Sequence, residues 1–259
     1  MEKEKRVHSF LAALLPWQGW KWAGSDALAL YDTDFASRTK GRAAFLSFVV
    51  IVLLFWAIYV PVHEFLHVAG CALAGGKVDE LVIGRGIGGA YWAKIFPFVT
   101  VEPGFGGRIS QFDPGSDLGF LLTDIFPYFL TPIGIYLLRH TVRKARIALA
   151  GPAIVLSFAP FLNLFGDYYE MGSIIVTVPF MSMGTAAAEG LRTDDLIGFL
   201  SGLPGNAAVQ AMGWPVALTL TAAGFIIGLV LAGWVYGCSR AAFPPWDGPK
   251  RTQQPGEPA

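Results

Sequence analysis

The residues whose types and spacing could do chemistry lie in one pentapeptide, His63-Glu64-Phe65-Leu66-His67. On a helix, residues four apart lie on the same face, so the His63 and His67 imidazoles can bind one metal ion. Glu64 lies on an adjacent face, within reach of a water molecule held by that metal. Two histidine ligands, a carboxylate base and an open coordination position are what a zinc hydrolase requires. The spacing therefore predicts a catalytic zinc site.

The third protein ligand of such a site must come from elsewhere in the chain. Acidic residues in or beside apolar segments are the candidates. They are Asp124, Asp167, Glu170, Asp194 and Asp195. Spacing alone does not choose among them, because the third ligand is distant in sequence from the two histidines.

The surroundings of the pentapeptide are strongly apolar. It follows the run AAFLSFVVIVLLFWAIYVPV, in a chain of 259 residues that is 54% hydrophobic and 15% charged. Soluble domains carry about 25% charged residues, so we predict a polytopic membrane protein. An ionisable group within a bilayer costs roughly 2.5–3.5 kcal/mol, so three in five residues indicate a compensating role such as metal binding.

Composition also argues against other classes of function. The formal net charge is zero. The sequence has no basic patch interleaved with aromatic residues, which is the pattern that would indicate nucleic-acid binding. The two cysteines, Cys71 and Cys238, form no C-x-x-C pair, so neither a zinc knuckle nor a redox motif is predicted.

We predict an α-helical polytopic membrane protein with about four to five transmembrane helices. The first contains the pentapeptide, is kinked at Pro61 and ends at Gly75-Gly76. A further apolar segment, residues 172–190, either crosses or re-enters, with a break at Pro179. The predicted spans are 43–74, 118–138, 147–165 and 214–237.

The segments between and around these spans have different characters. Residues 77–116 show strand-like alternation broken by glycines, which predicts a small membrane-associated region of one or two β-hairpins. Residues 191–210 are typical of an interfacial helix and loop. Basic residues before the first span and at 139–146 indicate a cytoplasmic side.

The two ends of the chain are expected to lie outside the bilayer core. Residues 1–42 form an N-terminal interfacial or cytosolic segment, with a tryptophan-anchored amphipathic stretch at 8–22 and an exposed connection at 23–42. Residues 239–259 are rich in proline and polar residues, which predicts a disordered tail.

The stretch from His63 to Gly70, continued by AGGKVDEL at 74–81, resembles the site-2 protease family of intramembrane zinc metalloproteases. In that family, the helix with H-E-x-x-H runs into a glycine and a short membrane-associated β-structured segment. Ala150-Gly151-Pro152, at the start of the third apolar segment, is similar to the family as well. The resemblance covers about residues 44–110 and 145–185.

The family carries an asparagine followed by an aspartate that is the third zinc ligand. By this resemblance, Asp167 is favoured as the third ligand, with Glu170 next, and Asn163 is implied to bind substrate. The family's aspartate lies in a Leu-Asp-Gly motif, whereas Asp167 here follows Gly166.

The resemblance implies a zinc endopeptidase formed by residues 43–238, a multi-pass protein of the cell membrane. Zn²⁺ would be the cofactor, and Glu64 the general base that activates a zinc-bound water. The partners implied are a transmembrane protein or peptide substrate and the lipid bilayer, without nucleic acid. A homo-oligomer or a regulatory membrane partner is compatible with the sequence. An extended substrate segment could pair with a strand edge between Val78 and Pro103.

Two other functions stay open at the level of sequence. One is a non-proteolytic membrane metal-binding regulator or transporter with a degenerate site. The other is a membrane zinc protease of the type that trims prenylated proteins, for which Glu189 is the candidate third ligand. Clustering of both histidines at one point favours catalysis over a transport path.

Overall fold

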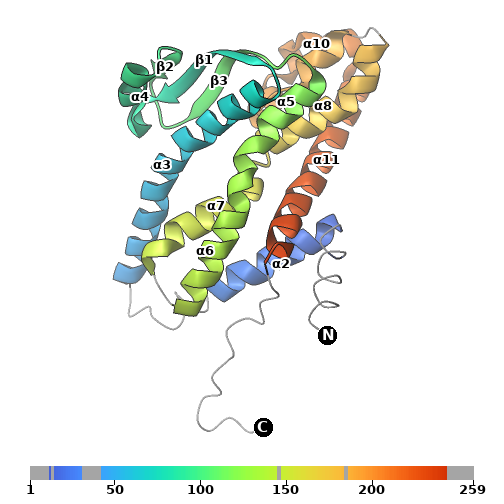
Figure 1. Cartoon of the computed structure of the whole chain (residues 1–259). Coiled ribbons are helices and arrows are strands. Elements are labelled where there is room, and N and C mark those ends of the chain that lie inside the picture. Colours follow the sequence, from blue (N-terminus) through green and yellow to red (C-terminus); the bar gives the residue numbers. More distant parts are fainter. Residues whose placement is uncertain (1–11, 13–14, 31–41, 145–146, 184–185, 244–259) are drawn as a thin grey trace.

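The fold is mostly helical, with a small three-stranded sheet at one end (Figure 1). The computed structural model describes residues 12, 15–30, 42–144, 147–183 and 186–243. The α-helices are α2 (Pro16–Leu30), α3 (Arg42–Leu73), α4 (Gly89–Ile95), α5 (Asp117–Ile125), α6 (Thr131–Lys144), α7 (Ala150–Leu162), α8 (Asp167–Ser182), α9 (Leu196–Ser201), α10 (Ala207–Met212) and α11 (Trp214–Ala241). Short 3₁₀ helices are η2 (Arg85–Ile87), η3 (Phe126–Leu130), η4 (Ile147–Leu149), η5 (Ala186–Leu191) and η6 (Leu203–Gly205). The strands are β1 (Lys77–Gly84), β2 (Val99–Glu102) and β3 (Gly107–Asp113).

Four helical segments within the described residues are long and apolar enough to cross a membrane. α3 supplies the first and α11 the last. The second is built from α5, η3 and α6, and the third from α7 and α8. The segments are Leu46–Leu73, Asp117–Arg143, Ala150–Ser182 and Trp214–Ala241. The predicted helical architecture, with four long apolar segments and a small β region, is confirmed.

The third segment is a helix broken in its middle. α7 ends at Leu162, four residues form a turn, and α8 begins at Asp167. The sequence predicted a span ending at 165 and a separate piece at 172–190; these are instead two halves of one segment, a correction to the prediction. Helix-terminating residues explain the break, because Asn163 closes α7 and Gly166 precedes α8 in a non-helical conformation.

α3 ends as predicted, at a glycine pair. Gly75 adopts φ 85°, a left-handed conformation that only glycine adopts at little cost. The Gly76 N–H donates to the Cys71 carbonyl (2.9 Å) and the Gly75 N–H to the Ala72 carbonyl (3.1 Å). This pair of bonds is a Schellman cap, and it turns the chain directly from the helix into β1.

The sheet has the order β2-β1-β3, and it differs from the predicted hairpins. β1 pairs with β2 in parallel and with β3 in antiparallel. A parallel pair needs a crossover, and α4 supplies it. The aromatic residues Tyr91 and Trp92 suggested a strand, but Trp92 packs on Phe65 of α3 and on Phe96 from the helical conformation. Tertiary packing has overridden β propensity here.

The region before α3 contains more helix than predicted. α2 extends to Leu30, so residues 23–30 are not an exposed connection. Asp26 is buried, where it accepts hydrogen bonds from Tyr236 (2.9 Å) and Arg240 (2.9 Å) of α11. This ion pair fixes α2 to the end of α11, which continues past the predicted boundary at 238. The rest of the predicted tail, 244–259, and the segment 31–41 lie outside the described residues.

α8 and α11 pack so closely that glycine is required at the contact. A Cβ on Gly172 would lie 2.0 Å from the Gly224 carbonyl oxygen, and one on Gly228 would lie 2.5 Å from the Tyr168 carbonyl oxygen. The contact holds the start of α8 in place, and it is backbone against backbone, so no side chain can move aside.

We expect Gly172→Val to separate α8 from α11. It should lower the free energy of unfolding by about 1–3 kcal/mol, the usual cost of overpacking. The measurement is thermal unfolding of the purified protein. Gly24→Ala is the matched control, because Gly24 lies in α2 with no atom within 4 Å of an added Cβ. An unchanged midpoint in Gly172→Val would contradict the close packing of these helices.

Candidate metal centre

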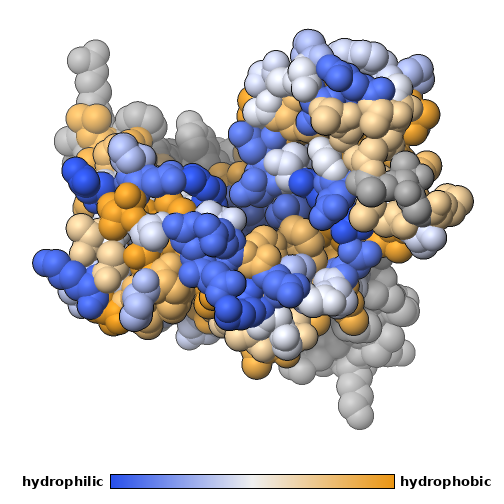
Figure 2. Space-filling model, turned by 90° about the horizontal axis from the view of Figure 1, so that it is seen from above, coloured by the Kyte–Doolittle hydropathy of each residue, from blue (hydrophilic) through white to orange (hydrophobic). Residues whose placement is uncertain are grey.

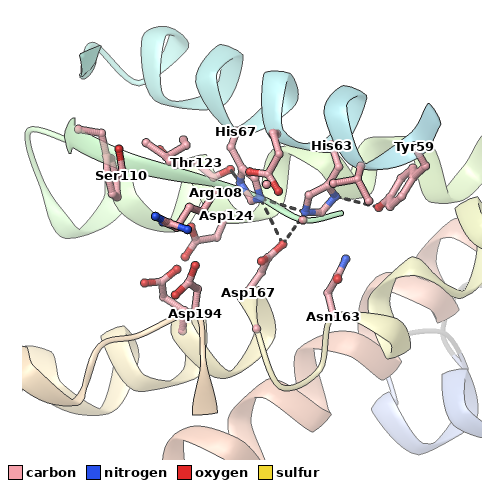
Figure 3. A pocket seen from close by; sticks show the side chains of 18 of the residues that line it. Tyr59, His63, His67, Arg108, Ser110, Thr123, Asp124, Asn163, Asp167 and Asp194 are labelled. Atoms are coloured by element: carbon pink, nitrogen blue, oxygen red, sulfur yellow. Dashed lines mark hydrogen bonds and ion pairs between the residues drawn. The ribbon is translucent and has the colours of Figure 1, made fainter. Parts of the chain in front are cut away.

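Three ligand atoms from two distant parts of the chain converge between α3 and the start of α8 (Figure 3). His63 Nε2 lies 3.0 Å from Asp167 Oδ2, and His67 Nε2 lies 3.3 Å from the same oxygen. The two Nε2 atoms are 3.0 Å apart. Both histidines are buried. Among the described residues, His63, His67 and Asp167 form the one group of His, Cys, Asp or Glu that could hold a metal ion.

The orientation of His67 is fixed by a backbone carbonyl. Its Nδ1 lies 2.8 Å from the Thr123 oxygen, and a carbonyl can only accept, so Nδ1 carries the proton. In the neutral ring, Nε2 is then an unprotonated acceptor aimed at Asp167. This carbonyl is available because the residue four positions later is Pro127, which has no N–H to close the helical bond.

Tyrosines hold the other two ligands. Tyr59 lies one helical turn before His63, and its hydroxyl is 2.8 Å from His63 Nδ1. Tyr128 of η3 donates to Asp167 Oδ2 at 2.6 Å. Tyr59 thus contacts the outer nitrogen of His63, the kind of contact that fixes a ligand's rotamer and tunes its basicity, whereas Tyr128 donates to the same Asp167 oxygen that faces the two histidines. The three residues and their contacts could therefore hold a metal ion.

The break between α7 and α8 is what brings Asp167 to the histidines. Asp167 is the first residue of α8, so its side chain projects from the helix end toward α3 (Figure 3). Asn163, the last residue before the break, lines the same cavity. Its Nδ2 atom is buried and makes no hydrogen bond of normal geometry with any residue that the structure describes.

Glu64 lies beside the three ligands and is buried. It lines the cavity together with them but is not one of the converging group. Gly107, the first residue of β3, lies against it, since a Cβ there would be 2.5 Å from Glu64 Cγ. The strand thus positions Glu64, and the glycine leaves room for its side chain.

The cavity has a volume of about 480 Å³ and lies on the face of the protein that carries the sheet. Figure 2 shows this face, where hydrophilic residues gather around a hollow. Its walls come from α3, β3, α5 and the break between α7 and α8. Its aromatic lining residues are Trp56, Tyr59, Phe105 and Phe112; Trp56 and Tyr59 pack on each other on α3. A cavity of this size is within the range of small-ligand sites in proteins.

The other acidic candidates divide into two groups. Asp124, Glu170 and Asp194 line the cavity without joining the three ligand atoms. Burial, and after it the Asp167 carboxylate, raises the pKa of Asp194 above its ordinary value. Asp195 points away, because its Oδ1 accepts from the Gly198 N–H (2.7 Å) and caps α9. Glu189 is exposed on η5 and is not among the residues lining the cavity.

The geometry brings together every residue expected at the metal: His63, His67, Asp167 and the adjacent Glu64. The sequence analysis did not identify Tyr59, Thr123 or Tyr128. Tyr59 could have been identified from the sequence, because its spacing of four residues from His63 puts both on one helix face. The sequence evidence for Thr123 was weaker: the proline four residues later leaves its carbonyl without a helical hydrogen bond. There was no sequence evidence for Tyr128, because its contact with Asp167 depends on how η3 packs against the start of α8.

Comparisons with known proteins give no family. No protein-family model, no curated protein and no solved structure matches this chain. The functional argument therefore depends on the site itself.

Proposed function

We propose that this protein is an intramembrane zinc metalloprotease of the site-2 protease type, which hydrolyses peptide bonds of membrane-embedded substrates. The observation that carries the proposal is the convergence of His63, His67 and Asp167 beside Glu64 in one cavity. All four residues lie on helical segments of transmembrane length. A metal centre and a carboxylate base within such segments suit hydrolysis away from bulk water.

The three ligand atoms lie within about 0.3 Å of the separations that zinc requires. With zinc–ligand bonds of about 2.0–2.2 Å, tetrahedral ligand atoms are separated by about 3.3–3.6 Å. The separations here are 3.0, 3.0 and 3.3 Å. His67 Nε2 and a carboxylate oxygen would otherwise face each other as two acceptors, and a cation between them removes that conflict. Two histidines and one carboxylate leave a fourth position open, as in catalytic zinc sites.

Bound zinc would supply Lewis-acid activation of a water molecule and of the scissile carbonyl. The Glu64 carboxylate would accept the proton of the attacking water and return it to the leaving amine. Tyr59, Tyr128 and the Thr123 carbonyl would keep the ligands in place during this cycle. The Asn163 amide, with its buried and unpaired Nδ2, would donate to a substrate carbonyl.

Membrane insertion is supported by the outer surface of α3. Leu46, Val50, Leu53, Leu54 and Ile58 are between 51% and 63% exposed. This is a contiguous apolar face that a lipid bilayer would cover. The broken helix is compatible with a membrane because its turn lines the cavity instead of facing lipid. Four crossings would put Arg143 and Arg240 on one side, the cytoplasmic side by charge bias.

The experiment that tests the proposal is metal removal and replacement on the full chain, purified in detergent. We expect about one zinc ion per chain, loss of cleavage of a transmembrane peptide after treatment with 1,10-phenanthroline, and recovery on adding Zn²⁺. Zinc is measured by elemental mass spectrometry and cleavage by peptide mass spectrometry. A zinc-loaded protein that cleaves no transmembrane peptide would favour the metal-binding regulator instead.

Substrate would be held in extended form along β3. This strand is an edge of the sheet, pairing only with β1, and Gly107, Arg108, Ile109 and Ser110 line the cavity. The sequence placed the pairing edge between 78 and 103, but the edge at the cavity begins at Gly107. An edge strand can pair with an extended peptide through main-chain hydrogen bonds.

We expect proline in β3 to lower cleavage roughly tenfold, the effect of losing one main-chain bond to substrate. Adjacent N–H groups point to opposite edges, so Arg108→Pro and Ile109→Pro are made in parallel. One of them removes a donor from the open edge while zinc content stays constant. Thr100→Pro in β2, the edge strand outside the cavity, is the control. Equal cleavage in all three variants would remove substrate pairing with β3.

A further inference from the structure

The cavity holds three carboxylates that neither bind the metal nor act as the base. Asp124 comes from α5, Glu170 from α8 and Asp194 from the segment before α9. In Figure 3, Asp124 and Asp194 lie on the same side of Asp167 as Arg108, and Tyr59 and Asn163 lie on the other. Asp124 and Asp194 thus mark an acidic end of the cavity, opposite the end at Tyr59.

Asp124 provides separate evidence that this end of the cavity lacks a hydrogen-bonding partner. The residue is 3% exposed, and its Oδ2 atom has no hydrogen-bond partner within the described part of the chain. A buried carboxylate oxygen without a partner is costly, and native proteins rarely keep one without a reason. Asp124 lines the cavity, so its unpaired oxygen belongs to the cavity wall.

With all three carboxylates ionised, the charges at this end do not balance. A divalent metal on His63, His67 and Asp167 would be neutralised by Asp167 and Glu64. The remaining charged residues that line the cavity are the three carboxylates and one guanidinium, Arg108. Arg108 is already engaged, since it pairs with Glu102 at 2.7 Å. The acidic end therefore favours an additional cation.

The spacing of the three carboxylates favours an organic cation over a second metal ion. Their oxygens do not form a group within 4.8 Å of one another, as His63, His67 and Asp167 do among the described residues. A metal needs such convergence. An ammonium or guanidinium group on a flexible side chain can reach carboxylates that lie further apart.

We propose that the acidic end binds a lysine or arginine side chain of the substrate, close to the scissile bond. Asp124, Glu170 and Asp194 are the residues that determine this specificity. The inference rests on the proposed proteolytic function and adds to it a substrate class: membrane segments with a basic residue beside the cleavage point. The apolar residues of the same segment would contact the opposite end, near Trp56 and Tyr59.

The first test measures binding without cleavage. The zinc-loaded Glu64→Gln full chain in detergent is titrated with fluorescent apolar peptides that carry Lys, Gln or Glu at one position, moved along the sequence. We expect the best Lys peptide to bind about 10- to 100-fold more tightly than its Gln and Glu counterparts. Adding Glu170→Gln and Asp194→Asn should reduce that ratio to below about threefold.

Matched variants separate this effect from a general loss of charge. Glu189→Gln removes an exposed carboxylate on η5, outside the cavity, and should keep the full Lys preference. Asp194→Lys should reverse the preference toward the Glu peptide, which a merely unfolded variant would not do. Zinc content and thermal unfolding of each variant establish that it is folded.

The same peptides are then given to the wild-type protein, so that the two proposals can fail separately. Lys-dependent binding without any cleavage would overturn the proteolytic function and keep the cationic subsite. Cleavage that ignores the charge of the peptide would overturn the subsite and keep the protease. Equal binding of all three peptides to the Glu64→Gln protein would overturn the subsite as well.

Discussion

Asp167→Ala is expected to lose the bound zinc and all cleavage with it. The variant leaves two histidines, 3.0 Å apart at Nε2, and no carboxylate between them. Loss of an outer partner of a metal ligand already costs roughly 10- to 100-fold in affinity, so loss of a ligand should cost more than about 100-fold. Zinc per chain, measured after dialysis against a competing chelator, should fall close to zero.

Glu170→Gln is the matched control, because Glu170 lies one turn further along α8 and lines the same cavity without joining the ligand atoms. It should keep its zinc. Asp167→Asn, which preserves side-chain shape, tests whether a loss of zinc is due to the missing charge or to a failure to fold. Full zinc in Asp167→Ala, or its loss in Glu170→Gln, would assign the third ligand elsewhere.

The sequence was sufficient for the half of the site that is local. His63, Glu64 and His67 lie within five residues of one helix, so helical periodicity alone predicts their relation. The same holds for the end of α3, where the Gly75-Gly76 pair predicts the cap that the structure has. These features depend on neighbours in sequence, and local rules describe them well.

The half of the site that depends on packing could be predicted only in part. Asp167 was favoured through its resemblance to a family motif, not through spacing, because residues 67 and 167 meet only when α8 packs against α5 and its first residue reaches α3. The break between α7 and α8 brings Asn163 and Asp167 close together. Asn163 and Asp167 flank one tight turn, so a single interruption places both side chains at the cavity.

Strand pairing in the sheet also could not be predicted from local sequence. Strand content at 77–116 was predicted from alternation, but pairing was not. A hairpin is the simplest pairing for neighbouring strands, and the short α4 crossover makes β1 and β2 parallel instead. As a result β3 becomes the edge strand beside Glu64, and the proposed substrate edge moves from the predicted 78–103 to Gly107–Asp113.

Glu64→Gln is expected to keep its zinc and lose cleavage by about 10²- to 10⁴-fold, the range of a general base. The amide has nearly the shape of the carboxylate, so it fits beside Gly107, but it cannot accept the proton of the attacking water. The ligand atoms of His63, His67 and Asp167 are untouched. Zinc content and the initial rate of peptide cleavage, measured on one preparation, check the two halves of this prediction.

Gly107→Ala tests the position of the base separately from its chemistry. The added Cβ would lie 2.5 Å from Glu64 Cγ, so Glu64 must move while its carboxylate stays intact. In Gly107→Ala, cleavage should fall by less than in Glu64→Gln, and zinc should be retained.

Glu189→Gln is the control for both variants. It removes an exposed carboxylate away from the cavity and should change neither zinc content nor cleavage. Loss of zinc in Glu64→Gln would mean that Glu64 is a metal ligand. Full cleavage in Glu64→Gln would mean that another group accepts the proton, and Glu170 and Asp194 are the other carboxylates in the cavity that could do so. Only retained zinc with lost cleavage is consistent with three ligands and a separate base.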